Sequence, residues 1–290
     1  MSSSRFAHGA PVGAALLLVA FAGSGGTSGP PAESTAMTWP GRATVRGRVT
    51  LEGPPPDVTE LNRAFQAARF RGGDRDVCLR APAVENEQQQ WRIGDDGGVA
   101  NVVVWLRPAD GSHFAMSKED LHPRTRTWPG EVVVTQPHLN FSPRLVVLFP
   151  SHFDPATKKQ VPTGQTFKVV NNSRVACDLN WRGDVDNPGG HVIVPVHGDV
   201  KADVKPARLP VVLMSSIHHW MRSYAWVFDH PYAAVTDLSG RYEIRNVPAG
   251  VELRLMAWHE ETGYLYGRDG IAVELKDGNN RKDLRVRADR

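Results

Sequence analysis

Thiol and imidazole groups are the side chains of this chain that could carry metal or redox chemistry. The 290 residues include two cysteines, Cys78 and Cys177, and eleven histidines. In an oxidising compartment the two cysteines could form one disulfide that joins the two halves of the chain. They could equally stay free, with one thiol binding a metal ion. The sequence leaves both alternatives open.

Imidazole and carboxylate groups also lie side by side in two short phrases, Asp229-His230 and W-H-E at residues 258–260. Neighbouring groups of this kind could serve general acid–base catalysis. Ser215 lies three residues before His218, but no acid that would orient the imidazole is evident. The hydrolase motif G-x-S-x-G and the zinc-protease motif H-E-x-x-H do not occur. The sequence therefore predicts a protein that is not an enzyme, with a secreted hydrolase as a distant alternative.

The elements that must position these groups are strands. Short apolar or alternating runs bounded by Gly and Pro predict strands at residues 44–51, 100–106, 131–135, 145–149, 166–170, 211–214 and 223–228. Residues 58–70 predict one short helix, because Leu61, Phe65 and Ala68 recur at helical spacing. Residues 71–90 are polar and predict a loop. Many short strands with little helix indicate an all-β sandwich or barrel.

The beginning of the sequence predicts export. An apolar run at residues 12–22 ends in A-F-A, which is typical of a cleaved signal peptide at residues 1–22. The run is too short for a membrane span. Residues 23–40 are rich in Gly, Ser, Pro and Thr, so we expect a flexible linker there. The mature protein is therefore expected in the periplasm or outside the cell, and its net charge of +3 gives no reason to expect nucleic acid as a partner.

A recurring phrase near the end of the chain resembles a known module. Residues 236–250 match the pattern T-D-x-x-G-x-[FY]-x-I-x-x-V-P-x-G from Thr236 to Gly250. This pattern resembles the closing half of the carboxypeptidase-regulatory, transthyretin-like module, and residues 45–51 resemble its opening strand. The resemblance implies that the two pieces pair across the segment between them.

That intervening segment resembles the cupredoxins. The resemblance is carried by G-Q-T-F-K-V-V-N-N-S at residues 164–173, S-S-I-H-H-W-M at 215–221 and V-F-D-H-P-Y at 227–232. It points to an exported bacterial group that couples a cupredoxin segment to the V-P-x-G module. The implied fold is a cupredoxin-like β-sandwich combined with a transthyretin-like β module. Its parts would be an N-terminal β module at 41–110, the cupredoxin-like segment at 131–230, and transthyretin-like strands with a tail at 231–290.

The cupredoxin resemblance implies a copper site made of two imidazoles, one thiolate and a weak thioether. This sequence departs from that set at two positions. Cys177 stands where the group has its first histidine, and Ser215 stands where it has its cysteine. His218 and Met221 stay in register, and His219 replaces a proline. The thiolate is thus moved across the implied site.

A second phrase departs as well. The group has C-x-[FY]-x-P-H where this chain has Leu139 to Arg144, with His138 just before it. Both ligand-type residues of the phrase are therefore replaced, which indicates a rebuilt or abandoned metal site.

We therefore expect an altered site in which Cys177, His218 and Met221 bind copper as a reduced ligand set, with His138 or His219 as a further ligand. A set of S, N and S donors favours copper(I) over copper(II). An electron-transfer protein with a relocated thiolate is an alternative. A further alternative is a metal-free structural or partner-binding protein, in which Cys177 is a small buried apolar residue. The partner expected is an envelope or redox protein.

Overall fold

The computed structural model describes residues 41–122 and 126–288. The predicted signal peptide and linker lie outside these residues. Within them, strands predominate and are arranged in several sheets, so the prediction of an all-β fold is confirmed. The helices of the described part are all too short or too polar to cross a membrane.

The middle of the chain forms a two-sheet sandwich, which we call the first sandwich. One sheet has the order β10-β7-β3 and the other has the order β4-β12-β11-β8-β9. The bounds of these strands, together with the hairpin strands β5 and β6, are β3 Glu131–Thr135, β4 Leu145–Leu148, β5 Ser151–Asp154, β6 Lys159–Pro162, β7 Thr166–Val170, β8 Cys177–Arg182, β9 Gly190–Val194, β10 Asp199–Ala202, β11 Val211–Met214 and β12 Arg222–Val227. Alternate side chains of these strands, such as Phe167 and Val169 on β7, are buried in a common apolar core.

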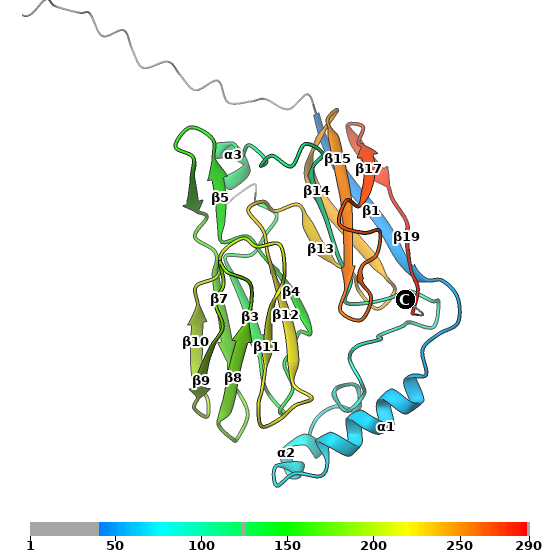
Figure 1. Ribbon diagram of the computed structural model, residues 1–290, viewed down its shortest axis with the longest axis vertical. Coiled ribbons are helices and arrows are strands. Elements are labelled where there is room, and N and C mark those ends of the chain that lie inside the picture. The colour runs from blue at the N-terminus through cyan, green and yellow to red at the C-terminus, as the bar shows by residue number, and fades with distance from the viewer. Residues whose placement is uncertain (1–40, 123–125, 289–290) are drawn as a thin grey trace, which may run out of the picture. The chain divides into compact units, whose positions relative to one another are not determined.

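Strands from both ends of the described chain form a second sandwich. Its sheets have the orders β14-β1-β18 and β13-β2-β15-β16, with β19 beside β1 and β17 beside β15. The bounds are β1 Gly41–Leu51, β2 Val103–Pro108, β13 Ala233–Val235, β14 Arg241–Ala249, β15 Glu252–His259, β16 Gly263–Tyr264, β17 Ile271–Glu274, β18 Gly278–Arg281 and β19 Leu284–Val286. Figure 1 shows β1, in blue, beside the orange and red C-terminal strands. The expected pairing across the first sandwich is confirmed, because β1 pairs antiparallel with β14 from Gly41↔Ala249 to Arg48↔Arg241.

An aromatic cluster joins the strands of the two sandwiches. Trp226 of β12 lies 4.8 Å from Trp105 of β2 and 5.6 Å from Trp258 of β15, measured between ring centroids. Tyr224 also contacts Trp258 edge to face. Aromatic pairs in this geometry stabilise a core beyond their buried area by about 0.5–1.5 kcal/mol each. The two sandwiches therefore share apolar packing.

A helical segment follows β1 and precedes β2. Helix α1, Val58–Arg69, confirms the predicted helix, and Asp57 caps it by accepting the amides of Thr59 and Glu60 at 3.1 and 3.0 Å. The prediction of a loop over 71–90 is wrong in part. It contains helix α2, Arg75–Leu79, and a 3-10 helix at Ala83–Asn86, both too short to give a periodic pattern. Helix α3, Lys118–Leu121, lies in a separate connection.

Candidate metal site

The loop that joins β11 to β12 carries most of the predicted ligands, and Asp178 of β8 holds it in place. β11 pairs with β8 up to Met214↔Asn180, and the loop begins at the next residue. The Asp178 carboxylate accepts hydrogen bonds from the Ser215 hydroxyl and, at 2.8 Å, from the Ser216 amide. Burial alone would raise the pKa of Asp178, but these bonds outweigh it and lower the pKa. Asp178 is therefore an ionised anchor for the loop.

Cys177 precedes this anchor as the first residue of β8. Its side chain is buried and belongs to the same apolar core as Met221, which has no exposed surface. Burial, reinforced by the negative charge of Asp178, raises the pKa of the Cys177 thiol to about 12. Without a metal ion the sulfur is thus a neutral thiol at physiological pH.

His218 is held through its backbone and through one of its ring nitrogens. Its amide donates to the Ser215 hydroxyl at 2.8 Å, and its carbonyl accepts the Met221 amide at 2.8 Å, which places the two side chains on one turn. Its Nε2 lies 3.1 Å from a carboxylate oxygen of Asp74, beside α2. Its Nδ1 is buried and has no hydrogen-bond partner among the described residues. A buried nitrogen in that state costs about 1–3 kcal/mol.

Neither of the two further candidates is buried as His218 and Met221 are. The His219 side chain is exposed, and that of His138 is partly buried with its Nδ1 3.1 Å from a carboxylate oxygen of Glu85. Cys78 is buried in the same apolar core as Cys177, and both cysteines are free in the described structure. Burial also raises the pKa of Cys78. Over residues 41–122 and 126–288, no group of three or more His, Cys, Asp or Glu side chains is arranged to hold a metal ion.

Two polar residues of the helical segment contact this site and were not predicted from the sequence. Asp74 contacts His218 across 144 positions of sequence. Arg69 has no exposed surface and donates to the carbonyls of Leu139 and His138 at 2.8 and 2.7 Å. Both come from the helical segment, whose polar sequence gives no indication of what it covers.

The side chains of Cys177, His218 and Met221 are of types that suit a soft metal ion. Cys177 and Met221 are buried, and of the two ring nitrogens of His218, Nδ1 is buried without a partner while Nε2 faces Asp74. Soft sulfur ligands with imidazole select copper(I) among the common metal ions.

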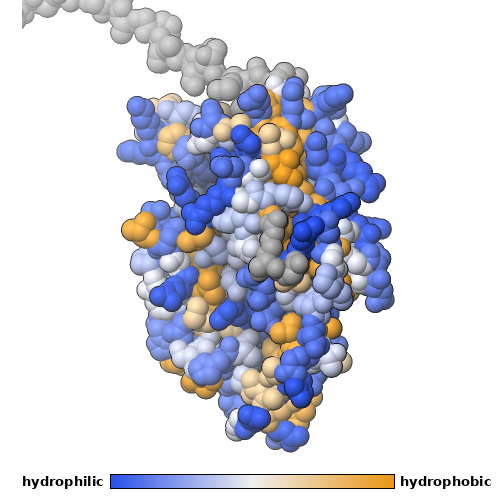
Figure 2. Space-filling model, turned by 45° about the vertical axis from the view of Figure 1, so that its right-hand side comes forward, coloured by the Kyte–Doolittle hydropathy of each residue, from blue (hydrophilic) through white to orange (hydrophobic). Residues whose placement is uncertain are grey.

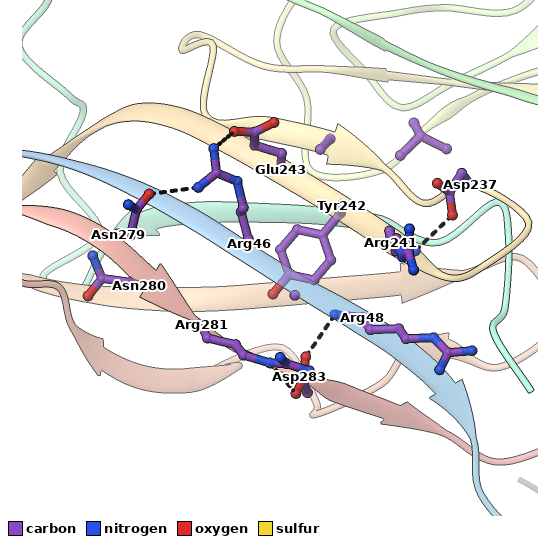
Figure 3. A pocket seen from close by; sticks show the side chains of 13 residues that line it. Arg46, Arg48, Asp237, Arg241, Tyr242, Glu243, Asn279, Asn280, Arg281 and Asp283 are labelled. Carbon is purple, nitrogen blue, oxygen red and sulfur yellow. Dashed lines mark hydrogen bonds and ion pairs between the residues drawn. The ribbon is translucent and has the colours of Figure 1, made fainter. Parts of the chain in front are cut away.

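A cavity lies elsewhere, on a face of the β14-β1-β18 sheet. Its volume is about 890 Å³, and Figure 3 shows that charged side chains surround it. Arg46 bonds Glu243 at 2.5 Å and Asn279 at 2.7 Å. Gly47 in its floor has no room for a side chain, because a Cβ there would lie 1.8 Å from the Lys282 carbonyl oxygen. These contacts tie the strands of the sheet together.

Similarity to known proteins is found among solved structures, each time over part of this chain. No family model matches the sequence, and no curated protein matches it either. Structures that it resembles are a purple cupredoxin from Nitrosopumilus maritimus (11% identity, 33% of this chain, 97% of that chain, TM-score 0.24) and a mutant amicyanin in its reduced Cu(I) form at pH 4 (10%, 43%, 97%, 0.25). A copper-containing nitrite reductase from Thermus scotoductus SA-01 is similar at 19% identity, over 42% of this chain and 27% of that one, with a TM-score of 0.26. These structural neighbours are cupredoxins, each similar to less than half of this chain.

Proposed function

We propose that this is an exported, non-catalytic cupredoxin-like protein that holds one copper(I) ion through Cys177, His218 and Met221. The observation that carries the proposal is the buried, unpartnered Nδ1 of His218. A metal ion would use that nitrogen and offset the cost of burying it. We include export in the proposal because residues 1–22 have the pattern of a signal peptide.

The surroundings of the nitrogen support a soft ligand set. Met221 lies one turn after His218 and is fully buried. Cys177 adjoins Asp178, which holds the start of the same loop through Ser215. The three donors thus come from two segments that one carboxylate fastens together. A bound copper(I) ion would displace the proton of the Cys177 thiol and join these segments a second time.

A metal-free scaffold is the second candidate function. The observation that favours it is the high pKa of Cys177, about 12, which is the property of an inert buried thiol. Such a scaffold would act by binding an envelope partner. On the face drawn in Figure 2, hydrophilic residues predominate and the hydrophobic ones lie in several separate groups. Val185 and Ile217 are apolar side chains that are exposed to solvent and could contact such a partner.

Copper content decides between these two functions. The mature protein, loaded anaerobically with copper(I) and desalted, is expected to retain one copper ion per chain by elemental analysis. The variant Cys177→Ser should lose it. Cys78→Ser is the matched control, because Cys78 is also a buried free thiol of the same core, and it should retain the ion. Background copper in all three proteins would leave the metal-free scaffold as the function.

A further inference from the structure

Asp74 stands at the N-terminal end of α2 but does not cap that helix. Aspartate is among the preferred N-cap residues because its carboxylate accepts the first free amides. Here the Asp74 side chain accepts no hydrogen bond from the α2 amides. Its carboxylate lies 3.1 Å from Nε2 of His218 instead, so the group is directed away from its own helix.

This contact determines which nitrogen of His218 carries the proton. A carboxylate accepts from a protonated ring nitrogen, so the proton of the neutral imidazole lies on Nε2. The lone pair is then on Nδ1, the nitrogen that is buried without a partner. His218 is 6% exposed and its ring centroid lies 5.2 Å from that of Trp220, which restricts rotation of the ring. Carboxylates that orient metal-binding histidines in this way raise metal affinity.

The helical segment that carries Asp74 is fastened to the first sandwich close to the same loop. The buried Arg69 at the end of α1 donates to the Leu139 carbonyl at 2.8 Å. The Trp220 indole, two residues after His218, donates to that same carbonyl at 2.7 Å. The segment and the ligand loop therefore meet at one carbonyl oxygen, and Asp74 lies where its carboxylate can act on His218.

We propose that Asp74 is a positioning residue of the metal site, which fixes the tautomer and ring orientation of His218 so that Nδ1 is presented to the ion. The metal part of this inference rests on the proposed function. The tautomer part concerns the metal-free protein and can be measured independently. Asp74 thus makes the segment between β1 and β2 part of the site.

The test compares Asp74→Asn with Asp76→Asn in the full mature chain. Asp76 is an exposed carboxylate of the same short helix, so it controls for loss of charge. Nitrogen chemical shifts of His218 in the metal-free protein should show a proton on Nε2 in wild type and in Asp76→Asn. An asparagine amide can accept or donate, so Asp74→Asn should show a mixture of both tautomers. A proton on Nδ1 in wild type, or an unchanged tautomer in Asp74→Asn, would overturn the inference.

Competition with a chromophoric copper(I) chelator gives the second readout. Affinity should fall about 10- to 100-fold in Asp74→Asn and stay unchanged in Asp76→Asn. Equal affinities in wild type and Asp74→Asn would overturn the positioning role while leaving the proposed function intact. Copper binding absent from wild type would overturn the proposed function, whatever the tautomer measurement shows. Thermal unfolding of each variant checks that the fold is kept.

Discussion

Arg144 occupies the position where the cupredoxin resemblance expects a histidine, and the structure gives it a different task. Its guanidinium bonds both carboxylate oxygens of Glu260, at 2.9 and 2.5 Å, and the Arg222 carbonyl at 3.0 Å. The two side chains are 8% and 2% exposed. Arg144 precedes β4 of the first sandwich and Glu260 follows β15 of the second. Arg144 thus makes a buried ion pair between the sandwiches.

We expect a substitution of either residue of this pair to destabilise the fold strongly, and substitution of both together to destabilise it less. Arg144→Met or Glu260→Leu leaves one buried charge without its partner, so each should lower the free energy of unfolding by about 3–5 kcal/mol. The double variant Arg144→Met/Glu260→Leu removes both charges and should recover much of that loss. Urea denaturation of wild type, the two single variants and the double variant measures the coupling free energy between the two residues. Arg281→Ala, which breaks the exposed Arg281–Asp283 pair, is the control and should change little. Single variants no worse than this control would contradict the prediction.

Elements with a strong apolar signature could be predicted from the sequence, and those without one could not. The runs at residues 131–135, 166–170 and 211–214 coincide with β3, β7 and β11. By contrast, β18 has the sequence G-N-N-R and pairs with β1 mainly through its backbone. A strand that buries little side-chain surface gives no hydrophobic period to detect.

Some residues of the candidate site could likewise be predicted from the sequence, and others could not. His218 and Met221 could be named because they lie in one short phrase, and the structure places them on one turn. Asp74 and Arg69 could not, because their partners lie far away in the sequence and their own segment is polar. A contact of this kind is fixed by tertiary packing and leaves no local pattern. The exposed position of His219 likewise depends on how the loop folds.

The helical segment should loosen when its buried anchor is removed. Arg69 donates to Asn86 at 2.8 Å as well as to the two carbonyls of the first sandwich, and hydrogen bonds from a charged group contribute about 1.5–3 kcal/mol each. Arg69→Met should therefore speed amide hydrogen exchange over α1 and α2 by at least about tenfold. Exchange in β7 and β11 should stay slow.

The exposed Arg71, just after α1, provides the matched control for that experiment. Arg71→Met removes the same charge near the same helix and should leave the exchange pattern of wild type. Uniform acceleration over the strands as well as the helices would show that Arg69 stabilises the whole fold, which contradicts a local anchor. Unchanged exchange over α1 would show that the segment is held by its apolar contacts alone.

At the scale of the whole molecule, the described chain is closed by strands from its two ends, and polar groups are buried inside it. Two of those groups are neutral imidazoles. His230, in the turn between β12 and β13, accepts the Tyr232 amide at 3.2 Å. His259, at the end of β15, has no exposed surface and packs 4.3 Å from Trp91. Burial lowers the pKa of each imidazole to about 4.

Because these two histidines are buried and neutral, we expect the free energy of unfolding to fall at a pH above the range in which Asp and Glu side chains with unshifted pKa values gain protons. An unfolded histidine has a pKa near 6.5 and so binds a proton at a pH where the folded one, with a pKa of about 4, does not. Their full contribution to stability is therefore present above pH 6.5 and is lost progressively as the pH falls toward 4. Between these two pKa values, each histidine lowers the free energy of unfolding by up to about 1.4 kcal/mol for each unit that the pH falls. Glu261 opposes it, because burial raises the pKa of Glu261 and its contribution grows as the pH falls.

Urea denaturation between pH 7 and pH 5 tests this dependence. The free energy of unfolding of wild type should fall across that range, and His259→Gln should show a shallower fall because one of the two imidazoles is gone. His219→Gln, which replaces an exposed histidine, should keep the slope of wild type. The comparison uses slopes, so a uniform loss of stability in His259→Gln does not affect it. A flat profile in wild type, or equal slopes in wild type and His259→Gln, would mean that these imidazoles gain protons in the folded protein as readily as in the unfolded chain.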